Sequence, residues 1–132
     1  MSPDDDSEQA GYYLEAAHCI KNLSTHKYLE FARIAIEKFC LVARVSQAAS
    51  LAKECGEKLD EDHDYEDAIK FYEKAAELYQ TDEQPTQANT LLVKASDLIV
   101  LTRDYKKLKV AVKVRSLLNS ESVNFVYRTT RK

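Results

Sequence analysis

The chain has 132 residues, of which 45 % are hydrophobic and 31 % are charged, and its formal net charge is −3. This length suffices for one domain with a buried core, and the two glycines and two prolines leave little material for hairpins or long loops. No apolar run approaches the roughly 18–20 residues of a membrane-spanning helix, and the acidic start MSPDDDSEQ is unlike a signal peptide, so a cytoplasmic location is expected.

Helix-spaced apolar side chains run through nearly the whole chain. They recur at intervals of three and four residues, which is typical of one face of an α-helix. Six such stripes follow one another along the sequence, at residues 10–20, 28–42, 48–59, 68–79, 88–99 and 105–118. No segment before residue 122 alternates convincingly with period two. The pattern therefore predicts an all-α protein.

Helix starts are marked by residues that can cap or initiate a helix. Ser24 or Thr25 is expected to cap the second helix. Asp64, followed by Asp67 three residues later, suggests a capping box at the start of the fourth helix, with Asp in place of the usual Glu. Pro85 is placed where it can begin the fifth helix.

The last predicted boundary falls at Arg103-Asp104, which is expected to separate a fifth helix from a sixth. The sixth helix carries apolar side chains on more than one side, more than a helix covered on one face can bury. We therefore predict that the tail folds back over it, through Val123, Phe125, Val126 and Tyr127, the alternative being that two chains meet there.

The helices repeat in pairs. Gln-Ala opens the first, third and fifth helices at residues 9, 47 and 87, which are offset by 38 and 40. Seven residues after each of these alanines stands another small side chain, namely Ala17, Cys55 and Ala95. Small residues at this spacing let neighbouring helices approach closely. A two-helix unit repeated every 36–40 residues predicts a right-handed α-solenoid of tetratricopeptide-like antiparallel helix pairs.

This repeat gives a division of the chain into three parts. Residues 1–7 form an acidic N-terminal segment, residues 8–118 form three helix pairs, and residues 119–132 form an irregular basic tail. The charge follows a similar division. Residues 1–100 hold 10 Lys/Arg against 20 Asp/Glu, a balance of −10, whereas residues 101–132 hold 9 against 2, a balance of +7. The basic C-terminal region is either a solvated surface or a docking surface for an acidic partner.

The sequence offers no pattern for catalysis or for a cofactor. Asp60, Asp62 and Asp64 imitate the start of a calcium loop, but Tyr65 stands where glycine is required and Phe71 where glutamate is required. The three cysteines are widely spaced and odd in number, which argues against a disulfide framework and against a zinc motif. We therefore expect neither a metal, nor a cofactor, nor an enzymatic activity.

Nucleic acid is not an expected partner either. The basic residues near the C-terminus are not interleaved with aromatic side chains in the way that single-strand binding requires, and the remainder of the chain is acidic.

Four segments together resemble the soluble NSF attachment protein (SNAP) family. They are EQAGYYL at 8–14, AIEKF at 35–39 running into QAASLAKECGEKL at 47–59, DYEDAIKFYEKAAELY at 64–79, and QANTLLVKASDLIV at 87–100. Their order and spacing are more specific than any single segment. The resemblance covers roughly residues 8–118 and corresponds to the middle repeats of the family. The combination of EQAG, A-x-E-x-x-G-K and LL-x-KAS is more similar to the gamma branch than to the alpha branch.

The resemblance implies a non-catalytic adaptor that binds SNARE complexes and links them to the NSF ATPase in vesicle transport. Such a protein is cytoplasmic and peripheral on membranes through its partners. Lys94, within LLVKAS, and Arg103 match basic positions of the family, and Lys106 and Lys107 are further candidates for partner contacts. Where the alpha branch has lysines in AAK and ANK motifs, this chain has Ser50 and Thr90.

Three alternatives remain beside this reading. The chain could be a generic tetratricopeptide-like interaction scaffold, or a truncated SNAP isoform unable to recruit NSF. A small hydrolase or metalloprotein is the alternative from another class of protein.

Overall fold

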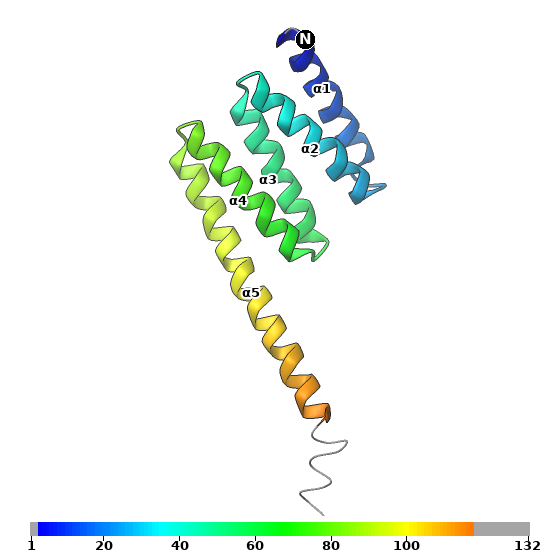
Figure 1. Cartoon of the computed structure of the whole chain (residues 1–132), viewed down its shortest axis with the longest axis vertical. Coiled ribbons are helices and arrows are strands. Elements are labelled where there is room, and N and C mark those ends of the chain that lie inside the picture. Colours follow the sequence, from blue (N-terminus) through cyan, green and yellow to red (C-terminus); the bar gives the residue numbers. More distant parts are fainter. Residues whose placement is uncertain (1–2, 118–132) are drawn as a thin grey trace, which may run out of the picture. The chain divides into compact units, whose positions relative to one another are not determined.

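The computed structural model describes residues 3–117, which form five α-helices. The helices are α1 (Pro3–Ile20), α2 (Thr25–Leu41), α3 (Val45–Glu61), α4 (Tyr65–Thr81) and α5 (Pro85–Leu117) (Figure 1). No strand occurs among these residues, so the predicted all-α class is confirmed. The chain divides into two units after Ile99, and α5 contributes residues to both.

The first unit is built from helix pairs. α1 packs against α2, α3 packs against α4, and α2 also packs against α3, so that the two pairs stand side by side (Figure 1). The core between them consists largely of alanines and a few large side chains. Ala17 and Cys55 are fully buried and Ala95 is 3 % exposed, as the small-residue spacing predicted. Tyr28, Phe39 and other large side chains fill the space between these close contacts.

Three successive helices have the same length and are joined by the same turn. α2, α3 and α4 each have 17 residues, and each is followed by a residue with positive φ: Ala43 at 59°, His63 at 62° and Glu83 at 56°. The amide of the next residue then donates back to the carbonyl five residues earlier, as Arg44 does to Phe39 at 2.8 Å. This is the Schellman motif, here made without the usual glycine.

The predicted helix starts are correct in position, but one of them lacks the predicted side-chain capping hydrogen bond. Ser24 caps α2 as predicted, because its side chain accepts a hydrogen bond from the backbone amide of Lys27 at 3.2 Å. α5 begins at Pro85, also as predicted. Asp64 occupies the N-cap position of α4, but its side chain makes no capping hydrogen bond, so the predicted capping box is wrong. The preceding turn leaves Asp64 with a φ of −91° and a ψ of 74°, outside the extended conformation that a capping side chain normally needs.

The first helix is longer than the sequence pattern indicated. It begins at Pro3 rather than near residue 10, so described residues of the acidic segment are helical. Two contacts hold this extension in place. Asp6 forms an ion pair with Lys38 of α2 at 3.6 Å, and Ser7 accepts a hydrogen bond at 3.1 Å from Arg44, the N-cap residue of α3. Acidic residues near a helix N-terminus are also favoured by the helix dipole.

The predicted break at Arg103-Asp104 is wrong, because α5 continues through it without interruption for 33 residues. Neither residue is a helix breaker, and the following lysines and leucine are good helix formers. The described residues therefore contain two antiparallel pairs followed by one long helix, rather than three pairs. The predicted tail and its fold-back through Val123, Phe125, Val126 and Tyr127 lie outside the described residues.

Candidate functional site

Lys94 lies in the first unit, on the surface where α5 meets α4. Its ammonium nitrogen is 5.7 Å from the centre of the Tyr72 ring, a cation–π contact. It shares a small pocket of about 260 Å³ with Tyr72 and with three carboxylates of α3: Glu57, Asp60 and Glu61. The Tyr72 hydroxyl donates to Asp60 at 3.2 Å. Lys94 is thus a single cation in a locally acidic surface, and its role in binding an acidic partner stays a prediction.

The other three predicted contact residues lie in the second unit. Arg103, Lys106 and Lys107 are all exposed on α5. Their spacing of three and four residues places them on the same side of the helix, where their charges reinforce one another. These three residues form a continuous positively charged surface, whereas Lys94 is a single cation among carboxylates.

The same part of α5 also presents apolar side chains. Leu101, Tyr105, Leu108 and Val112 are between 46 % and 63 % exposed, and their spacing of four, three and four residues makes them one stripe. At about 100° per residue, this stripe lies on the side of the helix opposite Arg103. The prediction that this stretch carries more apolar surface than it buries is confirmed for the described residues.

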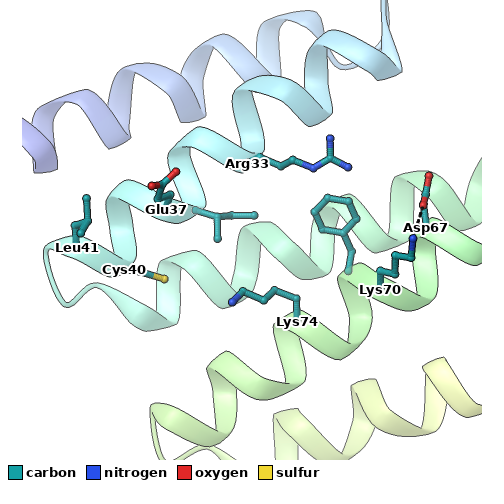
Figure 2. A pocket seen from close by; sticks show the side chains of 9 residues that line it. Arg33, Glu37, Cys40, Leu41, Asp67, Lys70 and Lys74 are labelled. Atoms are coloured by element: carbon teal, nitrogen blue, oxygen red, sulfur yellow. Dashed lines mark ion pairs between the residues drawn. The ribbon is translucent and has the colours of Figure 1, made fainter.

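A groove between α2 and α4 was not found from the sequence. Its volume is about 600 Å³. α2 supplies one wall and α4 the other, and Figure 2 shows the charged side chains that line it. The lining residues are Arg33, Ile36, Glu37, Cys40, Leu41, Asp67, Lys70, Phe71 and Lys74. The sequence contained one signal for this groove. Ala32…Glu37-Lys38 recurs as Ala68…Glu73-Lys74, which indicates that α2 and α4 occupy equivalent positions in successive helix pairs.

No candidate metal centre occurs within the described part of the chain. Among residues 3–117, no group of three His, Cys, Asp or Glu side chains is close enough to hold an ion. In the same part of the chain, every helix is too short or too polar to cross a membrane.

Comparison with known proteins gives a family and three curated relatives, among them two alpha-soluble NSF attachment proteins. An alpha-soluble NSF attachment protein of Vitis vinifera is 29 % identical over 124 residues, which make up 94 % of this chain and 42 % of the relative. An alpha-soluble NSF attachment protein of Saccharomyces cerevisiae is 31 % identical over 102 residues, or 76 % of this chain and 35 % of the relative. The chain therefore spans less than half the length of these relatives. No solved structure matches it. The family model described as "Soluble NSF attachment protein, SNAP" matches residues 2–122, and the chain belongs to this family, as its sequence motifs predicted.

Proposed function

We propose that this chain is a non-catalytic adaptor that binds SNARE complexes and links them to the NSF ATPase in vesicle transport and membrane fusion. The family match over residues 2–122 is the observation that carries this proposal. The helix pairs of the first unit agree with it, because stacked helices provide a rigid surface for a protein partner. The protein would act in the cytoplasm and reach membranes through its partners.

The finer assignment to the gamma branch and to the middle repeats is part of the same proposal. It is supported by EQAG, A-x-E-x-x-G-K and LL-x-KAS in the sequence. Within this assignment, the exposed face of Arg103, Lys106 and Lys107 is the proposed contact for the acidic SNARE bundle, with Lys94 as a further contact.

The test is a pull-down of the purified chain with assembled SNARE complex at increasing salt. We expect weak binding that falls as ionic strength rises from about 0.05 M to about 0.5 M, because exposed charge contacts are screened. The triple variant Arg103→Glu/Lys106→Glu/Lys107→Glu should weaken binding further. Lys53→Glu, on α3, controls for a single charge reversal away from α5 and should have little effect. Binding that ignores both salt and these substitutions would argue against this surface.

Two additional arms separate the alternatives. A generic tetratricopeptide-like scaffold would prefer chaperone C-terminal peptides to the SNARE complex. An adaptor that links the two partners should retain NSF together with the SNARE complex in the pull-down, whereas a chain that binds SNAREs without recruiting NSF should retain the SNARE complex alone.

A further inference from the structure

Two largely buried apolar side chains, Ile36 and Phe71, form the floor of the groove between α2 and α4. Ile36 is 7 % exposed and Phe71 is 9 % exposed, so each shows only an edge to the groove. Leu41 stands at one end with 67 % of its surface exposed. The groove thus offers apolar surface at its floor and at its rim.

The groove also has a charge pattern that differs from its surroundings. Three cations line it, Arg33, Lys70 and Lys74, although residues 1–100 carry twice as many acidic as basic side chains. Lys70 is paired with Asp67 at 3.7 Å, whereas Arg33 and Lys74 form no ion pair among the described residues. The Arg33 guanidinium instead lies 5.3 Å from the centre of the Phe71 ring.

The directions of the side chains favour an anionic occupant. In Figure 2, Arg33 extends from α2 and Lys74 from α4 into the space between the two helices, whereas Glu37 and Leu41 point away from α4. Two cations from opposite walls therefore face the space above the apolar floor. A carboxylate in this space could pair with Arg33 of α2 or with Lys74 of α4.

The dimensions and position of the groove suit a helix. The lining residues run from Arg33 to Leu41 on α2 and from Asp67 to Lys74 on α4, which corresponds to roughly 10–12 Å or about two turns on each wall. α3 already packs against both α2 and α4. A helix laid in the groove would pack on the same two helices, in the helix-in-groove mode of recognition.

We propose that this groove binds an acidic amphipathic helix of a partner protein. An apolar side chain of that helix packs on Ile36 and Phe71, and its flanking carboxylates pair with Arg33 and Lys74. The proposal is independent of SNARE and NSF binding, because it rests on side chains of α2 and α4 and on none of α5. The SNARE pull-down could therefore fail without affecting it.

The test uses a designed helical peptide of about 15 residues, with leucines at positions i, i+3, i+4 and i+7 and glutamates on both sides of this stripe. Binding is measured by fluorescence anisotropy of the labelled peptide. Two matched peptides replace every glutamate with glutamine or every leucine with alanine. We expect the acidic peptide to bind at least about tenfold more tightly than either, since charge and apolar contact both contribute.

The location is tested on the same complex by cysteine footprinting. Cys40 lines the groove and is exposed, and Cys19 is exposed on α1 outside it. The acidic peptide should slow alkylation of Cys40 and leave that of Cys19 unchanged. The double variant Arg33→Glu/Lys74→Glu should lose about tenfold in affinity, whereas Lys27→Glu/Lys53→Glu, with the same change of net charge outside the groove, should not.

Circular dichroism establishes that each variant is folded. If the double variant unfolds, Leu41→Ser at the exposed rim takes its place and should weaken binding several-fold, with Leu23→Ser, at another exposed leucine that does not line the groove, as its control. The proposal is overturned if the acidic peptide does not bind, if the glutamine peptide binds equally well, if Cys19 and Cys40 are protected alike, or if the groove variants bind as tightly as their controls.

Discussion

Gly56 on α3 lies so close to Tyr72 on α4 that a β-carbon at Gly56 would come within 2.7 Å of two carbons of the tyrosine ring. Real β-carbons essentially never approach another atom this closely. Tyr72 cannot easily move away, because it is 1 % exposed and its hydroxyl donates to Asp60 at 3.2 Å. The absence of a side chain at Gly56 therefore sets how closely α3 and α4 pack.

The first prediction concerns this contact. Alanine in place of glycine within a helix usually stabilises by about 0.5–1 kcal/mol. At Gly56 we expect the opposite sign, a loss of roughly 1–3 kcal/mol, because the methyl group overpacks the contact. Gly11→Ala is the matched control, since nothing lies within 4 Å of its β-carbon position. Urea denaturation of the two variants measures the difference, and equal effects would contradict this packing.

The second prediction concerns Ala95, which is 3 % exposed. Ala95→Glu should destabilise the protein strongly, by several kcal/mol, because it places a charge without a partner in a close helix contact. The neighbouring Ser96 is exposed, so Ser96→Glu adds the same charge at the surface and should have little effect. Thermal melting of both variants tests the prediction, and an unchanged melting temperature for Ala95→Glu would refute the pairing register.

The third prediction concerns the turn that follows α2. Ala43 has a φ of 59°, a left-handed conformation that costs an L-residue roughly 1–2 kcal/mol and costs glycine little. Ala43→Gly should therefore raise the free energy of unfolding by about 0.5–1 kcal/mol. Ala16→Gly, inside α1, should lower it by a similar amount. Destabilisation by both substitutions would mean that the turn does not require this conformation.

The fourth prediction concerns the polar link between α1 and α3. The carboxylate of Glu54 pairs with Nε2 of His18 at 3.0 Å and with Nζ of Lys21 at 2.9 Å. Partial burial acts to raise the pKa of Glu54, but the hydrogen bonds and charges of His18 and Lys21 together outweigh it, and its pKa lies below the ordinary value.

The sign of the pH dependence follows from this lowered pKa. The ionised carboxylate contributes stability above the unfolded pKa of about 4.3, and the contribution is lost as the pH falls through the folded pKa. Glu54→Gln should therefore destabilise at pH 7, and the difference from the natural chain should shrink in acid. Melting curves between neutral pH and about pH 3 test this. Glu30→Gln removes a more exposed ion pair with Lys27, so its stability difference from the natural chain should be smaller and should depend less on pH.

The fifth prediction concerns the thiols. Burial raises the pKa of Cys55 to about 12, so its reactive thiolate is scarce at neutral pH and also inaccessible. Cys19 and Cys40 are exposed. A thiol reagent should therefore modify two cysteines rapidly in the folded protein and the third only after unfolding. The variant Cys19→Ser should leave one rapid reaction, and rapid modification of all three thiols in the folded chain would contradict the burial of Cys55.

Several features of this protein were readable from the sequence because they depend on neighbours along the helix. Apolar residues at spacings of three and four identify a helix wherever they occur, and this located α2 to α4 closely. Ser24 and Pro85 act on backbone groups within a few residues, so their roles at helix starts could also be predicted. The spacing of Ala17, Cys55 and Ala95 predicted burial because one helix face repeats about every seven residues. The family motifs could likewise be recognised, because each is a continuous stretch of sequence.

Other features were decided only by the tertiary structure, since they join residues that are far apart in the chain. The groove needs Arg33 and Phe71 to meet across two helices, and the carboxylates around Lys94 come from α3. The positive φ of Ala43, His63 and Glu83 appears where the chain must reverse within a few residues, whatever side chain stands there. The continuity of α5 through Arg103 was missed because two polar residues resemble a turn in sequence, although nothing in their backbone preferences interrupts a helix.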